Sequence, residues 1–156
     1  MQYIENPKID LDQLLDLYKS VGWTSYTGQP EMLKNAYRHS LFTLAAYDGE
    51  RLIGIIRAVG DGYSILFIQD LLILPEFQRQ GIGTNLLNKV IDTFPNVYQQ
   101  HLLTDNSEKT RKFYESVGFK DVNDIQCTAL LLSERTRNRK TFIFTHYCRI
   151  NISILL

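Results

Sequence analysis

Cysteine is scarce in this chain, since only Cys127 and Cys148 occur among 156 residues. Two cysteines are too few for a disulfide framework, and their separation does not fit a zinc site. We therefore expect no metal centre and a protein that works in a reducing compartment, which predicts a cytoplasmic location.

An excess of charge and a long apolar run are missing as well. Seventeen Lys and Arg balance 17 Asp and Glu, whereas general nucleic-acid and membrane-surface binders carry a basic surplus. No run approaches the roughly 20 apolar residues of a membrane span, and the first ten residues lack the charged-then-apolar order of a signal peptide. Neither nucleic acid nor a membrane is expected as a partner.

The rest of the composition is that of one ordinary globular domain, with 44% hydrophobic and 22% charged residues. The end of the chain differs. From Ser133 onward it has five Lys or Arg against one acidic residue, followed by apolar runs. We predict a domain over residues 1–132 and an extension over 133–156. An added strand, an oligomer contact such as a homodimer interface, and an unneeded extension remain open for this segment.

Spacing predicts the elements of the first half. After a short opening strand, apolar residues from Leu11 to Tyr18 recur at helical intervals behind Asp10, a suitable N-cap, and Pro30 begins a second helix through Ser40. From Leu41 to Leu74, three apolar runs are separated by Asp-Gly and Gly-Asp-Gly. These turns predict a three-stranded antiparallel meander.

The third run leads into a glycine-containing turn, Gln78 to Gly83, and then into an amphipathic helix that Pro95 ends. The first N–H groups of a helix lack internal partners and lie at the positive end of its dipole, so an anion fits there. Gly81 and Gly83 allow the backbone to approach a diphosphate closely. The turn is therefore predicted to hold a phosphorylated ligand.

Further elements complete a mixed sheet. A strand over Val97–Leu103 should lie parallel to the strand ending at Leu74, because a helix connects them. Thr104 to Ser107 offers several N-caps for the next helix, with Asp105 and Glu108 spaced as a capping box. Gly118 is placed to end that helix, and a final strand is predicted over Gln126–Leu132.

Two motifs at matching separation carry a family resemblance. Gln78-x-x-Gly81-x-Gly83 resembles the acetyl-CoA signature of the GNAT superfamily of N-acetyltransferases, and Phe113-Tyr114 followed by Gly118-Phe119 resembles a second segment of that family. The order of elements is similar to that of the family from residue 2 to 132. The resemblance implies an α/β (α+β) GNAT fold: a mixed central sheet flanked by helices, with parallel central strands that splay apart.

The resemblance also implies how acetyl-CoA, the cosubstrate, is held. Backbone N–H groups of the turn would bind the diphosphate, while the end of the central strand would bond to the pantetheine arm and supply an oxyanion donor, for which we favour the N–H of Ile73. The implied cofactor-binding residues are Leu72, Ile73, Leu74, Gln78, Arg79, Gln80, Gly81, Ile82, Gly83, Thr84 and Asn106.

Proton transfer needs two further groups, a general acid and a general base. Tyr114 matches the family tyrosine that acts as general acid toward the thiolate, although a core aromatic is the competing interpretation. Many relatives carry Glu-Asp where this chain has Gln69-Asp70. Asp70, alone or through water, is therefore the candidate base. An equally weighted interpretation is that Asp70 is a hydrogen-bonded structural carboxylate. Two interpretations of Arg57 remain open: its side chain contacts the substrate, or it points outward from the strand.

Trp23 and Tyr26, in a predicted loop, either cap the core or line the acceptor pocket. The implied activity is transfer of acetyl to a primary amine of a small molecule or peptide. A catalytically idle acyl-CoA-binding module and a protein lysine or N-terminal acetyltransferase are the alternatives.

Overall fold

The computed structural model describes residues 1–131, which form two compact units, residues 1–103 and 104–131. The predictions for the extension, and Leu132 and Cys148 with them, lie outside the described residues. No helix of the described part is long and apolar enough to cross a membrane.

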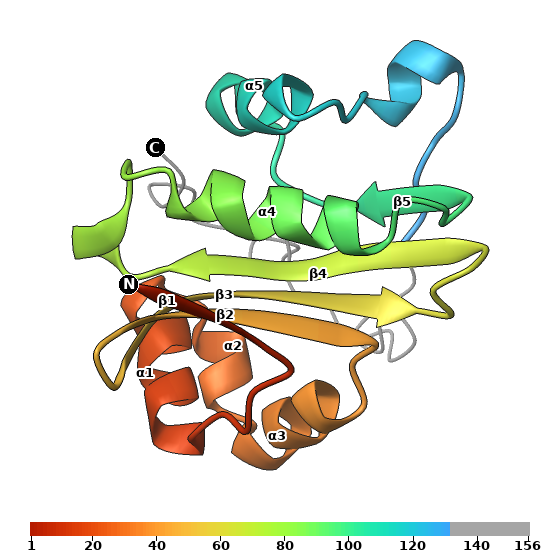
Figure 1. The fold of residues 1–156 in the computed structure, drawn as a ribbon. Coiled ribbons are helices and arrows are strands. Elements are labelled where there is room, and N and C mark those ends of the chain that lie inside the picture. Colours follow the sequence, from red (N-terminus) through yellow and green to blue (C-terminus); the bar gives the residue numbers. More distant parts are fainter. Residues whose placement is uncertain (132–156) are drawn as a thin grey trace, which may run out of the picture. The chain divides into compact units, whose positions relative to one another are not determined.

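The first unit is built on a mixed sheet of five strands whose order in space is their order in the chain (Figure 1). Three neighbouring pairs are antiparallel, and the last pair is parallel. The strands are β1 (Gln2–Glu5), β2 (Phe42–Asp48), β3 (Arg51–Gly60), β4 (Ile65–Ile73) and β5 (Gln99–Leu102). The predicted mixed sheet with parallel central strands is confirmed.

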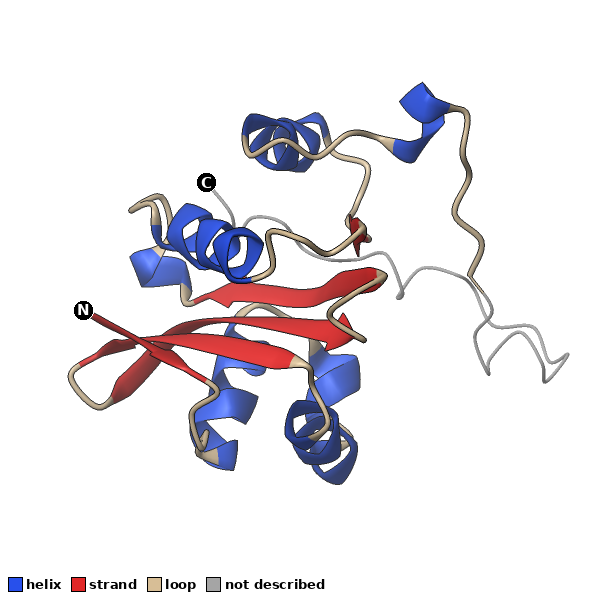
Figure 2. Ribbon diagram, turned by 45° about the vertical axis from the view of Figure 1, so that its right-hand side comes forward, coloured by secondary structure: helices blue, strands red, loops and turns tan. Residues whose placement is uncertain are grey.

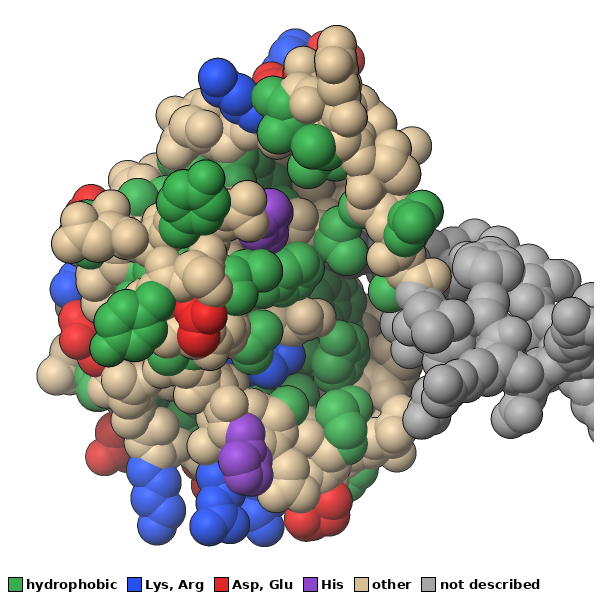
Figure 3. Space-filling view, turned by 90° about the vertical axis from the view of Figure 1, so that its right-hand side faces the viewer, with side chains coloured by type: hydrophobic (Ala, Val, Ile, Leu, Met, Phe, Trp, Pro, Cys, Tyr) green, Lys and Arg blue, Asp and Glu red, His purple; other side chains and the backbone are tan. Residues whose placement is uncertain are grey.

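Helices cover both faces of this sheet (Figures 1 and 2). One face carries α1 (Leu11–Ser20), α2 (Thr24–Thr27) and α3 (Pro30–Arg38), and the other carries α4 (Ile82–Thr93). The core between the layers is aliphatic, with Leu17, Leu44 and Ile55 fully buried. Other hydrophobic side chains reach the surface, where Figure 3 shows them among polar ones on one face.

Local chemistry fixes these elements much as the sequence predicts. Asp10 caps α1, because its side chain accepts a hydrogen bond from the N–H of Gln13 at 3.0 Å. Gly49 takes φ +60° in the tight turn that joins β2 to β3. The loop predicted around Trp23 and Tyr26 is partly wrong, since Thr24–Thr27 forms one helical turn.

The turn from β3 to β4 is organised by Asp61, whose Oδ1 accepts hydrogen bonds from the N–H groups of Tyr63, Ser64 and Ile65. The Ser64 hydroxyl adds a bond to Oδ2, and these bonds lower the pKa of the Asp61 carboxyl. Gly60 is required here, because its φ is +138° and a Cβ would lie 2.2 Å from the Ile65 carbonyl oxygen.

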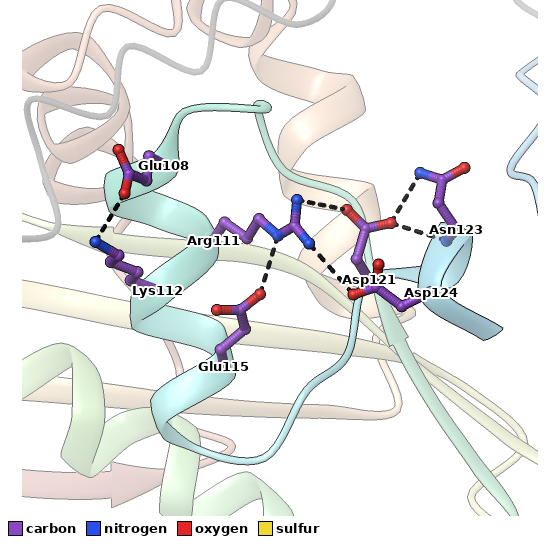
Figure 4. Close-up of polar contacts among 7 residues, drawn as sticks. All are labelled: Glu108, Arg111, Lys112, Glu115, Asp121, Asn123 and Asp124. Atoms are coloured by element: carbon purple, nitrogen blue, oxygen red, sulfur yellow. Dashed lines mark hydrogen bonds and ion pairs between the residues drawn. The ribbon is translucent and has the colours of Figure 1, made fainter.

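The second unit consists of α5 (Glu108–Ser116) and the 3-10 helix η2 (Val122–Ile125). Figure 4 shows Arg111 joining them: it donates to Glu115 at 2.9 Å and to Asp124 at 3.2 Å, and lies 3.6 Å from Asp121. In the same view Lys112 pairs with Glu108 at 2.7 Å.

Two expectations for this unit are corrected. The N-cap of α5 is Ser107, which accepts from the N–H of Thr110, whereas Asp105 accepts from the N–H of Ser107 itself. The predicted capping box of Asp105 with Glu108 is therefore wrong. The final strand is also wrong over 126–131, where the chain forms no strand and Gln126 takes the left-handed φ of +60°.

Candidate functional site

The turn after β4 has the geometry that its glycines predict. The 3-10 helix η1 (Pro75–Phe77) leads to Gly81, which is the N-cap of α4 with φ +79° and ψ 0°. Apart from Gly81 itself and its two chain neighbours, no residue of the described part has an atom within 4 Å of where a Cβ of Gly81 would stand. Glycine is needed at this position for its left-handed backbone rather than for lack of space. Arg79 also has a left-handed φ, +60°, without being glycine.

The first turn of α4 leaves main-chain donors open. Within residues 1–131 no side chain caps this end of the helix, and its first internal bond runs from the N–H of Asn85 to the Gly81 carbonyl at 3.0 Å. The N–H groups of Ile82, Gly83 and Thr84 therefore lack helical acceptors and lie at the positive end of a twelve-residue helix. This arrangement suits an anion such as a diphosphate.

Side chains within the turn hold its own backbone. Gln78 donates through Nε2 to the Ile73 carbonyl at 3.1 Å, and Gln80 donates in the same way to the Glu76 carbonyl at 3.1 Å. Arg51 of β3 pairs with Glu76 at 2.6 Å. Gln78 thus closes the turn onto the end of β4, while Arg79 and Gln80 are exposed beside the open donors.

The parallel pair β4–β5 separates halfway along β4. Strand β5 pairs only with Ile65 to Ile68, so β4 from Gln69 to Ile73 has no β5 partner. Main-chain groups on that half of β4 which point away from β3 are available for hydrogen bonding. This is the splay that the family resemblance implies.

The β3–β4 register identifies those groups. The N–H of Leu74 donates to the Ile53 carbonyl at 2.8 Å, and hydrogen-bonded positions alternate along an antiparallel pair. The main-chain groups of Leu72 and Leu74 therefore face β3. Those of Leu71 and Ile73 face the open edge, where Gln78 occupies the Ile73 carbonyl. Leu71 was missed at the sequence level, because a strand register cannot be read from residue types.

Asp70 and Arg57 lie on the face of the sheet that carries α1 and α3, and both are buried, at 1% and 6% exposure. Arg57 donates through Nε to Asp70 Oδ2, while Oδ1 has no hydrogen-bond partner among residues 1–131. Burial raises the pKa of the Asp70 carboxyl, and the charge of Arg57 opposes that rise. The outward-facing interpretation of Arg57 is wrong.

A cluster of four aromatic residues, Tyr18, Trp23, Tyr26 and Tyr37, adjoins this pair through Tyr37. The Tyr18 and Tyr37 hydroxyls lie 3.1 Å apart, and the Arg57 guanidinium lies 5.4 Å from the Tyr37 ring centroid. Trp23 stacks on Tyr26 with centroids 5.7 Å apart, and its Nε1 has no partner within the described chain. Trp23 and Tyr26 are half-buried, and both contact the Tyr18 ring. They therefore lie at the edge of the cluster and remain partly exposed to solvent.

Tyr114 and Asn106 belong to the second unit. Tyr114 is 9% exposed, and its ring contacts Phe113 and Phe119 at centroid distances of 5.0 and 5.9 Å. Burial, aided by the charge of Asp105, raises the pKa of its hydroxyl, which therefore stays protonated at neutral pH. Asn106 is exposed in the segment before α5. Among the described residues, no three His, Cys, Asp or Glu side chains are grouped so as to hold a metal ion.

Comparison with known proteins agrees with this geometry. The family profile of the acetyltransferase (GNAT) domain matches residues 18–132. A GNAT family acetyltransferase from Streptococcus pneumoniae TIGR4 is 40% identical, with a TM-score of 0.77 over 86% of this chain and 98% of that one. The chain belongs to the GNAT acetyltransferase family.

More distant relatives extend the picture. A histone acetyltransferase of Glycine max is 30% identical over 120 residues, 71% of this chain, and the chain spans 52% of that protein's length. An N-acetyltransferase from Thermoplasma acidophilum, solved in complex with coenzyme A, shares the fold with a TM-score of 0.60 at 20% identity over 77% of this chain and 91% of that one.

Proposed function

We propose that the chain transfers the acetyl group of acetyl-CoA to a primary amine of a small molecule or peptide. The observation that carries the proposal is the open edge of β4, where no described strand bonds to the N–H groups of Leu71 and Ile73, together with the open donors at the start of α4. Family membership and the CoA complex of the Thermoplasma acidophilum relative support the choice of cosubstrate.

Each part of this edge has a task in the reaction. The first N–H groups of α4 bind the diphosphate, and Leu71 and Ile73 bond to the pantetheine arm as an added strand would. The N–H of Ile73 stabilises the oxyanion that forms when the amine attacks the thioester carbon. Gln78 keeps Ile73 in place through its carbonyl.

Protons must leave the amine and reach the sulfur. An alkylamine resembling lysine has a pKa near ~10.4, so it must lose a proton before attack. Tyr114 donates its hydroxyl proton to the departing thiolate as the carbon–sulfur bond breaks, since its raised pKa keeps the hydroxyl protonated. Water or Asp70 accepts the amine proton.

Trp23 and Tyr26 are the proposed walls of the acceptor site, because they lie half-buried beside the Asp70 cluster. The likeness to a histone acetyltransferase favours, as a second candidate, an acceptor that is a lysine or N-terminal amine of a protein. We also propose a cytoplasmic site of action, with small-molecule or peptide amines as partners and with neither nucleic acid nor a membrane among them.

A turnover screen tests this function. Thiol release from acetyl-CoA is measured with polyamines, arylalkylamines, amino acids, aminoglycosides and peptides, and CoA affinity is measured by calorimetry. We expect CoA binding and thiol release with at least one amine. Binding without release for every acceptor would support the idle acyl-CoA-binding module, and absence of binding would overturn the proposal.

The proposed domain boundary has its own test. A chain truncated after Glu134 should keep the CoA affinity of the full chain, because every residue assigned to the cosubstrate precedes residue 107. Calorimetry measures the affinity, circular dichroism the fold, and light scattering the oligomeric state. An unfolded or insoluble truncated chain would show that residues beyond 134 supply core and that the boundary is wrong.

A further inference from the structure

A β-bulge lies at the start of the open half of β4. Arg57 of β3 lies opposite Asp70, and the next residue, Ala58, lies opposite Ile68. Gln69 is therefore the extra residue of the bulge. If the register of Ala58 with Ile68 continued along β4 without the bulge, Leu71 would lie opposite Ile55. Because hydrogen-bonded positions alternate along the ladder, the main-chain groups of Leu71 would then face β3. The bulge decides which N–H groups face the open edge.

The buried ion pair stands at this bulge. Arg57 and Asp70 are directly opposite each other, and the register shift falls between Arg57 and Ala58. The bond from Arg57 Nε to Asp70 Oδ2 joins the two strands at the point where the regular ladder is interrupted. Two buried charges are retained at such a place only if each is paired.

Tyrosine side chains of helices α1 and α3 pack near the ion pair, on the face of the sheet that these helices cover. The Tyr37 ring lies against the guanidinium, and the Tyr37 hydroxyl is bonded to that of Tyr18. Tyr18 is fully buried, so it leaves the pair little room to rearrange. Since one carboxylate oxygen of Asp70 is engaged by Arg57 and the residue is 1% exposed, Asp70 is better placed to hold structure than to exchange protons with a substrate.

We propose that Arg57 and Asp70 are positioning residues, which lock the bulge at Gln69 and thereby aim the N–H groups of Leu71 and Ile73 at the thioester and its pantetheine arm. This inference rests on the proposed function, and it assigns Asp70 a role other than that of general base. Loss of either partner should disturb cosubstrate binding and turnover together, because both use the same half of β4.

The test uses Asp70→Asn and Arg57→Gln in the full chain, with Lys89→Gln as control, since Lys89 pairs with Glu5 on the surface at 3.7 Å. CoA affinity is measured by calorimetry, and kcat and KM are measured across pH with an acceptor from the screen. Both variants should bind CoA at least about tenfold more weakly and lower kcat by a similar factor, a loss of 1.4 kcal/mol for each tenfold change. Their pH profiles should parallel that of the native chain.

Hydrogen exchange gives a readout that does not depend on activity. The Leu72 amide bonds to β3 beside the bulge, so its exchange should be faster in both variants and unchanged in Lys89→Gln. If the native chain binds no CoA, the proposed function fails, but this measurement still decides whether the pair locks the bulge.

Three outcomes would overturn the proposal. Native CoA affinity in Asp70→Asn, with kcat restored at high pH, would make Asp70 the base. Lowered stability with native kinetics would leave the pair a purely structural contact. If the single variants fail to fold, Arg57→Met combined with Asp70→Leu replaces the pair by apolar side chains. That double variant should fold yet remain weak in CoA affinity and kcat, and native values in it would show that the pair is not needed.

Discussion

Replacing Gly83 by valine is expected to weaken CoA binding at least about tenfold, or 1.4 kcal/mol, while the fold survives. Gly83 is the second residue of α4, where the helix presents its open N–H groups. A branched side chain at this position would stand between those donors and a diphosphate. Valine adopts helical backbone angles at a small cost, so the helix itself should form.

Calorimetry measures this loss, and Asn88→Val is the matched control. Asn88 is exposed on the same helix beyond its first turn, so the substitution adds a branched side chain without approaching the open donors. Native affinity in the control together with a loss in Gly83→Val would locate the diphosphate at the start of α4. Equal affinity in both variants would contradict that location.

Tyr114→Phe should lower kcat by at least about tenfold and leave CoA affinity nearly unchanged. General acid catalysis contributes typically ~10²–10⁴-fold, and water is expected to replace part of it. Phenylalanine keeps the ring contacts with Phe113 and Phe119 and removes only the hydroxyl. A falling kcat at constant affinity separates a chemical role from a packing role.

Tyr98→Phe provides the comparison, because Tyr98 is 84% exposed and has no part in the proposed chemistry. The two variants are compared by steady-state kinetics with an acceptor from the screen. Native kcat in Tyr114→Phe would leave Tyr114 a core aromatic and would assign protonation of the thiolate to water.

Sequence reasoning succeeded where local chemistry decides the structure. The cap at Asp10, the Asp48-Gly49 hairpin and the helix that follows Gly81 were all predicted, because one or two residue types determine each of them. Over 126–131 the apolar run predicts a strand that the structure does not form. An apolar pattern shows only that a segment could pair, since the partner strand is a tertiary feature.

The predictions for the candidate site also divide into those that local chemistry decides and those that depend on how strands pair. The glycines predicted where a helix would leave donors open. The main-chain groups of Ile73 face the open edge, and its role as oxyanion donor stays a prediction. The bulge at Gln69 could not be predicted, because it exists only in the register between two strands. For that reason Leu71 was missed. The pairing of Arg57 with Asp70 could not be predicted either, because residue types alone left Asp70 open between a base and a structural carboxylate.

The order of strands in the sheet bears on how the chain folds. The spatial order is the chain order: η1 and α4 lie between β4 and β5, and β2, β3 and β4 pair through short turns. Closing such short loops costs little conformational entropy. Among the described strands, the pairs that join distant parts of the chain are β1 with β2, where Gln2 pairs with Tyr47, and β4 with β5, where Ile65 pairs with Gln99. Strands β3 and β4, by contrast, are neighbours along the chain. The strands that carry the bulge and the open edge therefore come together through local contacts, a topology associated with rapid folding.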